Sequence, residues 1–467
     1  MPKRVIQHLR HDWQRIRTKD TFARNAFTIM GGNSAVVVSQ LLLTPLIARI
    51  YGPEAYGIYG LYIALVMNIT SFTDLGYSIA YVLPKENERF MHLFRFNLTL
   101  LGMAVVLTAV VGLFKEELYT AIPSWGPLGD LIHLLPLGVA VYGLAVFFTQ
   151  WLTRIRAFST SVYIGSSTTI TLRLFNLGYG LWRGATSFGL IIGDVVVNSL
   201  AAVAYSIALS KHGLRELFAG WSWARMRELA VEYKRYPLFT FPERWVNQIG
   251  MQLPVFLLIN DPVIVGQFAL SSSLLMIPLR VLGYSFSTVF IQKAAETVND
   301  DPELLGRITK GLYQRLFWVG LVPFTCMMYF SDVVFTFVLG EQWHDAGVIT
   351  AFLGLFFFFR LTSEPMVTIF YAQRREHALL LFHIVLTSIR LAVMVPMILL
   401  GLGSGAVILG FAIVSTIGYM VLGYLLLRAA KQNALFLTVR SLVIILGACG
   451  LLTLVRIWTM GDPLPSL

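Results

Sequence analysis

Five arginines stand inside long apolar stretches of the sequence, where a charged side chain needs a special reason. They are Arg173, Arg244, Arg280, Arg360 and Arg390. If these stretches cross a bilayer, each guanidinium costs at least about 2.5 kcal/mol near the centre, so it should face a wet interior or a partner. A guanidinium is permanently charged and holds phosphate oxygens through two parallel hydrogen bonds. The pattern predicts a cavity that binds an anion, in particular a phosphorylated one.

Fewer acidic side chains share these stretches: Asp74, Asp194, Glu243 and Glu364. Glu243 adjoins Arg244 and Glu364 follows Arg360 by four residues, so structural ion pairs are an alternative to binding. Snorkelling of Arg244 or Arg390 from a span end is another. The arginine surplus favours Arg173, Arg244, Arg280 and Arg360 as ligands of the anion. Asp74, Glu243 and Glu364 are the candidate carboxylates for a coupling proton or sodium ion.

Composition defines the elements that must hold these charges. The 467 residues are 56% hydrophobic and only 13% charged, with a mean hydropathy of +0.70, which is typical of an integral membrane protein. Cys326 and Cys449 lie in apolar runs, and the eight histidines lack metal-site spacing. We therefore expect no disulfide framework and no metal site. A Gly-Lys dipeptide is missing as well, which excludes a P-loop ATPase.

Thirteen apolar segments approach the length of a membrane-spanning helix. They cover residues 25–49, 57–83, 96–114, 131–152, 160–181, 188–210, 237–259, 263–291, 311–330, 347–371, 378–400, 405–427 and 441–460. The sequence therefore predicts an all-α polytopic membrane protein.

Basic residues are distributed unevenly between the two sides of these segments. With a cytoplasmic N-terminus, 27 lysines and arginines fall inside and four outside, as the positive-inside rule requires. The net charge of +11 then reflects topology and contact with anionic lipids, and needs no nucleic acid. A basic patch for an acidic protein is the alternative.

The sequence repeats a short pattern of residues at an offset of 209. A shift of 209 residues places Pro45, Pro53, Gly57 and Tyr59 on Pro254, Pro262, Gly266 and Phe268. Each copy ends one apolar segment in a proline and glycine turn and begins the next at once, as in a tight transmembrane hairpin. Two tandem halves are thus predicted, a common transporter plan with the substrate between them.

Two polar regions complete the predicted organisation. Residues 1–23 form a basic arm whose Val5, Leu9, Trp13 and Ile16 share one helical face, which favours the inner membrane surface over a solvated arm. Residues 211–236 form a linker in which Leu214, Leu217, Phe218 and Trp221 line a helical face. The predicted regions are therefore the arm 1–23, a first lobe 24–210, the linker 211–236, a second lobe 237–427 and an extra helix with a tail, 428–467.

Particular motifs resemble those of a known family. The stretches GGNSAVVVSQLLLTPLIARIYGPEAYGIYGLY and DLGYSIAYVLPKE are similar to the N-terminal signature of the polysaccharide transporter family, and LGEQWHDAG, Leu339 to Gly347, resembles its turn before the tenth span. Members of this family are flippases of lipid-linked oligosaccharides, such as O-antigen or exopolysaccharide repeat units. The family lies within the superfamily of multidrug, oligosaccharidyl-lipid and polysaccharide (MOP) exporters. The resemblance implies two six-helix lobes in a V shape, with one or two extra C-terminal helices.

The resemblance also implies a function and a setting. The substrate would be an oligosaccharide on undecaprenyl pyrophosphate, moved across the bacterial inner membrane by ion-coupled alternating access in a monomer. A polysaccharide polymerase and a chain-length regulator are implied partners, and no cofactor beyond a coupling Na⁺ or H⁺ is expected. A multidrug antiporter would favour an acidic cavity, and a membrane glycan polymerase would need catalytic groups on a large outer loop. The sequence favours neither alternative.

Overall fold

The chain is helical throughout the part that the structure describes. The structure is a computed structural model and describes residues 21–218, 220–283, 302–373, 375–463 and 465. Within these ranges there is no β-strand. The predicted all-α class is therefore confirmed. The predicted arm lies almost wholly outside the described residues.

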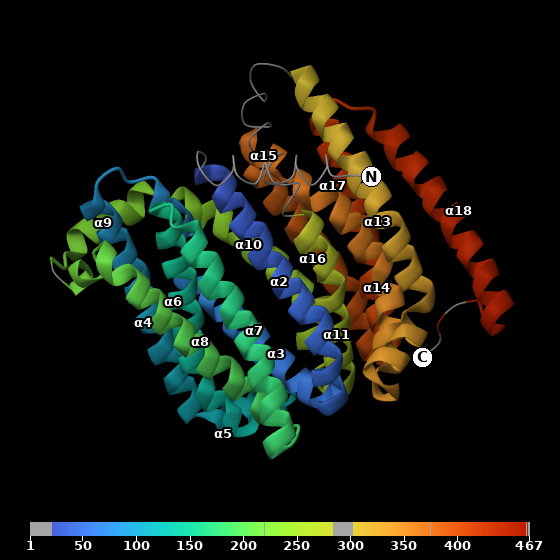
Figure 1. Cartoon of the computed structure of the whole chain (residues 1–467), viewed down its shortest axis with the longest axis horizontal. Coiled ribbons are helices and arrows are strands. Elements are labelled where there is room, and N and C mark those ends of the chain that lie inside the picture. The colour runs from blue at the N-terminus through green and yellow to red at the C-terminus, as the bar shows by residue number, and fades with distance from the viewer. Residues whose placement is uncertain (1–20, 219, 284–301, 374, 464, 466–467) are drawn as a thin grey trace, which may run out of the picture.

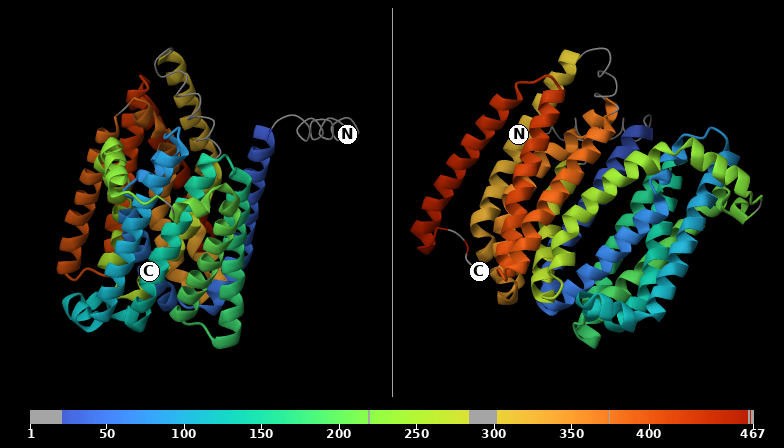
Figure 2. Two further views of the ribbon diagram at one scale, coloured as in Figure 1. Left: turned by 90° about the vertical axis from the view of Figure 1, so that its left-hand side faces the viewer. Right: turned by 180° about the vertical axis from the view of Figure 1, so that it is seen from behind.

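The helices form two lobes that lie side by side (Figures 1 and 2). The first lobe contains α2 (Thr21–Ile50), α3 (Pro53–Asp74), α4 (Asn87–Leu113), α6 (Leu135–Arg154), α7 (Phe158–Arg183) and α8 (Ser187–Leu209). The second contains α10 (Phe241–Leu257), α11 (Pro262–Pro278), α13 (Pro302–Leu339), α14 (His344–Ser363), α16 (Glu376–Leu399), α17 (Ser404–Ala429) and α18 (Ala434–Met460). Short helices α5 (Lys115–Ala121), α9 (Trp223–Glu232) and α15 (Thr368–Ala372) lie in the connections.

Each predicted span overlaps one of these long helices, and the end of the predicted span 263–291 lies outside the described residues. Ten of the described helices are long and apolar enough to cross a membrane, which makes the protein a multi-pass membrane protein. The other three are the partly described α2, the 17-residue α10, and α7. Along α7, serines, threonines and Arg173 lower the hydropathy, as expected for a helix that faces a polar interior.

The structure corrects two sequence-based boundaries. The predicted span 57–83 is interrupted, because α3 ends at Asp74 and the left-handed residues Leu75 (φ 46°) and Gly76 (φ 77°) redirect the chain into a 3₁₀ helix. In the linker, the regular helix is α9, whose Met226 and Leu229 are buried. The stretch Leu214–Phe218 is only a 3₁₀ turn.

The repeated hairpins meet each other at one end of the molecule. Helices α3 and α11 make the most extensive contact between the lobes. A methyl group at Gly57 would overlap the carbonyl oxygen of Pro262, and one at Gly266 would overlap that of Pro53. This reciprocal backbone contact relates the residues that the 209-residue shift relates, and only glycine permits so close an approach. We call this end the outer end, following the predicted orientation.

A second contact closes the outer end around the turn between α13 and α14. The buried Trp343 indole and the Gln342 amide both donate to the carbonyl oxygen of Ala48, at 2.8 and 3.0 Å. Arg49 donates in return to the carbonyl oxygens of Phe337 and Val338, at 2.8 and 3.0 Å. The last turn of α2 is thereby tied to the second lobe, and these bonds must break before the lobes can separate at this end.

Closer to the inner end, α3 continues along α10. The Asn68 amide donates to Gln252, and the Phe72 ring meets the ring of Trp245 edge-on at 5.0 Å between centroids. The two lobes are therefore joined along α3 in this state.

Candidate functional site

Two of the predicted arginines approach each other from opposite lobes. Arg173 on α7 is half-buried, and its Nη1 donates to Thr44 on α2 at 2.8 Å. Its Nε is buried and has no hydrogen-bond partner in the part of the chain that the structure describes. Arg280, just after α11, is exposed and lies within electrostatic range of Arg173. Among the described residues, no acidic side chain pairs with either, so both retain N–H donors for an anion.

Helix packing produces this arrangement. Helix α7 packs along α2, and α2 also touches the segment Leu279–Gly283 that carries Arg280. In that segment the helix widens to π geometry directly after Pro278. Because π segments redirect side chains and are frequent at functional sites, the position of Arg280 fits a binding role.

Arg244 and Asp74 lie near each other at the inner end. Arg244 is exposed in the first turn of α10, beside Tyr371 and within electrostatic range of Asp74. The Asp74 carboxylate accepts from the Ser78 N–H at 2.8 Å and from the Ser78 hydroxyl at 3.0 Å. Asp74 thus stabilises the turn after α3, a structural role that the sequence did not indicate.

Arg360 and Glu364 form the ion pair that their spacing allows. The Arg360 Nε and Nη2 donate to the two carboxylate oxygens of Glu364 at 2.7 and 3.1 Å. The Arg360 Nη1 contacts the sulfur atoms of Met251 and Met276 at 3.7 and 3.5 Å. Arg360 is 7% exposed. Its forked donors are therefore already occupied by a carboxylate in this state.

Arg390 is buried, so the snorkelling interpretation is wrong. Only 1% of it is exposed. Its Nε donates to Ser415 at 2.9 Å and its guanidinium lies over the Phe411 ring, 4.9 Å from the centroid. Cation–π contact and a hydroxyl stabilise the charge here, and no carboxylate from the described ranges pairs with it. Packing of α16 against α17, which the sequence does not reveal, turns this residue inward.

Glu243 does not pair with its neighbour Arg244. The Glu243 carboxylate, 3% exposed, lies 3.3 Å from the His383 Nε2 and accepts from the Tyr371 hydroxyl at 2.8 Å. Adjacent residues on a helix point in different directions, which explains why the two charges separate. His383 is a site residue that sequence reasoning missed, because it lies in another helix.

A further carboxylate, Asp194, sits in the core of the first lobe. It is fully buried on α8 and accepts from the hydroxyls of Tyr59 and Tyr142 at 3.2 and 3.1 Å. Its Oδ2 has no hydrogen-bond partner among the described residues. In the sequence, Asp194 was one of four intramembrane acids. Its predicted span, 188–210, contains no arginine that could pair with it, and this could have marked it as a candidate for ion binding. A buried carboxylate with a vacant oxygen can hold a proton or a cation.

Comparison with known proteins places this geometry in a family. A family described as "Polysaccharide biosynthesis protein" matches residues 46–348. Comparison with curated proteins finds no match.

Solved structures share the fold at low sequence identity. An inward-facing multidrug resistance MATE family transporter of the MOP superfamily has a TM-score of 0.60 and 14% identity, over 87% of this chain and 96% of that one. The lipid II flippase MurJ in an inward closed conformation has a TM-score of 0.60 and 14% identity, over 90% of this chain and 91% of that one. A MOP superfamily transporter from Pyrococcus furiosus has a TM-score of 0.53 and 15% identity, over 88% of this chain and 96% of that one.

The family match spans well over half of the chain, and the similar folds extend over nearly all of it. Both agree with the motifs at Gly31–Glu86 and Leu339–Gly347. The chain therefore belongs to the polysaccharide biosynthesis protein family and has the fold of the MOP-superfamily membrane transporters.

Proposed function

We propose that the protein is a flippase for an oligosaccharide linked to undecaprenyl pyrophosphate, such as an O-antigen or exopolysaccharide repeat unit. The observation that carries the proposal is the pair Arg173 and Arg280, which come from the two lobes, lie within electrostatic range of each other and pair with no acidic side chain among the described residues. A pyrophosphate offers oxygens to two guanidinium groups at once and would offset their repulsion. The family membership and the fold shared with a lipid II flippase support this substrate class.

The contacts between the lobes support a mechanism. The outer end is closed by the Gly57 and Gly266 contact and by the bonds to Ala48. Entry of substrate from the inner side would require the contacts of Asn68 with Gln252 and of Phe72 with Trp245 to open. The pyrophosphate and sugars would enter between the lobes while the polyprenyl chain stays in lipid. Opening of the outer end would then release them to the other leaflet.

A multidrug antiporter with the same fold is the rival function. A cationic drug would be repelled by Arg173 and Arg280, for which the described residues provide no paired carboxylate. The free positive charge therefore favours the anionic lipid-linked substrate over a drug cation.

Deletion of the gene tests the function, in a bacterium that makes the glycan. Lipid-linked repeat units should accumulate at the cytoplasmic face, and the plasmid-borne gene should restore export. Normal surface glycan without inner accumulation would contradict the proposal. The setting proposed is the inner membrane with a cytoplasmic N-terminus. Reporter fusions after Lys85 and Asn260 should accordingly signal inside and outside, respectively.

For the coupling ion we propose Asp194 in addition to the sequence candidates Asp74, Glu243 and Glu364. Asp194 is buried, has a vacant oxygen and lies at the Tyr59 and Tyr142 hydroxyls, whereas the oxygens of Glu364 are taken by Arg360. Asp194→Asn keeps the hydroxyl contacts and removes the charge. We expect export to become independent of an imposed ion gradient and to fall about tenfold or more. Unchanged gradient dependence would exclude Asp194.

The Arg360 and Glu364 pair makes a separate prediction. Arg360→Ala leaves Glu364 unpaired and should reduce export, whereas adding Glu364→Ala should restore most of it, because no unpaired charge then remains in the membrane. Export by the single and double variants is measured at matched membrane levels. Failure of the double variant to recover would show that Arg360 itself contacts the substrate.

A further inference from the structure

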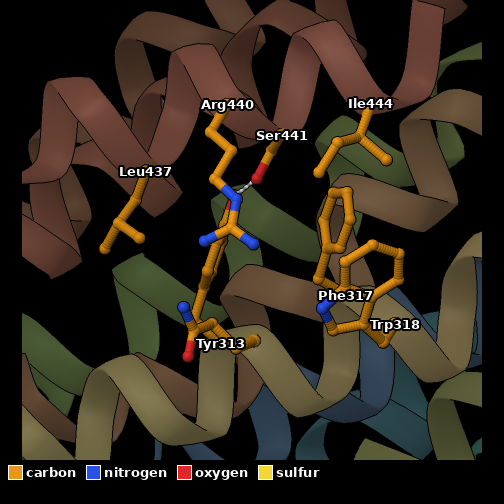
Figure 3. A pocket seen from close by; sticks show the side chains of 8 residues that line it. Tyr313, Phe317, Trp318, Leu437, Arg440, Ser441 and Ile444 are labelled. Carbon is orange, nitrogen blue, oxygen red and sulfur yellow. Dashed lines mark hydrogen bonds between the residues drawn. The ribbon is translucent and has the colours of Figure 1, made fainter. Parts of the chain in front are cut away.

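A groove runs between α13 and α18 on the outside of the second lobe, away from the lobe interface. Figure 3 shows the side chains that line it. They are Tyr313, Gln314, Phe317 and Trp318 from α13, and Leu437, Arg440, Ser441 and Ile444 from α18. We refer to this set as the α13–α18 groove. Helix α18 lies at the edge of the bundle (Figure 1) and is long and apolar enough to cross a membrane.

Polar contacts fix α18 beside α13 both at the groove and near the outer end. At the groove, the Tyr313 hydroxyl donates to the Ser441 hydroxyl at 2.9 Å. Toward the outer end, the buried Arg456 donates to both carboxylate oxygens of Asp332 at 2.9 and 2.6 Å. Because both contacts involve buried polar groups, their loss would be costly in a membrane. Specific contacts therefore fix the position of α18 relative to α13, and with it the groove between them.

The groove has a polar part and an apolar part. Arg440 is exposed, and no hydrogen bond or ion pair within the described ranges uses its guanidinium. The side chain of Gln314, which also lines the groove, makes no hydrogen bond within the described ranges. Phe317, Trp318 and Ile444 form the apolar part, with Trp318 52% exposed. An amphipathic ligand would satisfy both parts.

The groove lies at the level of a membrane surface. Helix α13 has 38 residues, which at 1.5 Å per residue makes it about 57 Å long, whereas a bilayer core is about 30 Å thick. Counting about twenty residues back from its outer end at Leu339 brings the inner boundary close to Trp318. Arg440 is in the second turn of α18, which begins at Ala434. Tryptophan and arginine are both typical of this interfacial layer.

A second basic site lies on the cytoplasmic side of the groove. Arg307 and Lys431 line a neighbouring pocket with Glu303 and Gln432. Along this side of the two helices, the linings of the two pockets together carry three basic side chains and one acidic side chain. This balance favours a ligand with net negative charge.

We propose that the α13–α18 groove binds an anionic glycerophospholipid of the inner leaflet. The lipid phosphate accepts hydrogen bonds from Arg440 and Gln314, and one acyl chain lies along Phe317, Trp318 and Ile444. Such a lipid would lie over the contact between α13 and α18 and cover the exposed face of Trp318. The site is distinct from the arginines between the lobes and does not depend on their role.

Native mass spectrometry of the purified full chain with added dioleoylphosphatidylglycerol tests the proposal. Arg440→Ala should weaken binding about tenfold or more, as expected for loss of a charge-assisted phosphate contact, and Arg440→Lys should weaken it less. Ile444→Trp should weaken it with the charge retained, because the indole fills the apolar part. Arg428→Ala is the matched control, since Arg428 is exposed in the last turn of α17 and outside the groove.

Three outcomes would overturn the proposal. They are unchanged binding in both Arg440→Ala and Ile444→Trp, an equal loss in Arg428→Ala, and equal binding of dioleoylphosphatidylcholine. Displacement of the lipid by inorganic phosphate would instead identify a free-anion site and would also overturn it. Thermal unfolding of each variant in detergent separates loss of the site from loss of the fold.

Discussion

Replacing Arg173 or Arg280 with alanine is expected to reduce glycan export by about tenfold to a hundredfold, the largest loss among the intramembrane arginines. Each side chain offers unpaired N–H donors near the other lobe. A hydrogen bond between a charged group and phosphate contributes about 1.5–3 kcal/mol, and each 1.4 kcal/mol corresponds to a factor of ten. Export of the lipid-linked glycan is measured at matched membrane levels.

Two kinds of variant serve as controls for this prediction. Arg173→Lys and Arg280→Lys should restore export only in part, because lysine keeps the charge and loses the forked geometry. Arg183→Ala should behave like wild type. Arg183 is the last residue of α7, the helix that carries Arg173, and its guanidinium lies 4.5 Å from the centroid of the exposed Trp182 ring, outside the lobe interface. Wild-type export from both Arg173→Ala and Arg280→Ala would refute the anion site.

Gly57→Ala is expected to abolish export almost completely while the protein still enters the membrane. The added methyl group would overlap the Pro262 carbonyl oxygen, which belongs to backbone and cannot rotate away. The two lobes must then separate at the outer end, so the closed state is lost. The reciprocal contact predicts the same result for Gly266→Ala.

The change of state can be measured directly. Spin labels at the exposed positions Glu54 and Glu341, in a background without Cys326 and Cys449, report the distance across the outer end. Gly57→Ala should shift this distance to longer values. Gly60→Ala is the matched control on the same helix, because its methyl group would meet Ala269 at an ordinary 3.5 Å. An unchanged distance in Gly57→Ala would show that the contact does not hold the lobes closed.

Local sequence determined the helices and their hairpins. An apolar stretch of about twenty residues can satisfy its backbone in lipid only as a helix, so composition was enough to place a helix in each predicted span. The turn residues Pro53 and Pro262 begin their helices as their restricted backbone requires. The pair Arg360 and Glu364 was predictable too, because residues four apart on a helix are neighbours.

Tertiary structure alone decided which distant residues meet. Hydropathy indicates that a helix is buried in a membrane and says little about which side faces which neighbour. Snorkelling was therefore an alternative for Arg390, which lies over Phe411. An ion pair with Arg244 was an alternative for Glu243, which is held by His383 from another helix. These partners depend on how helices rotate and cross, and that is set by packing among segments far apart in the sequence.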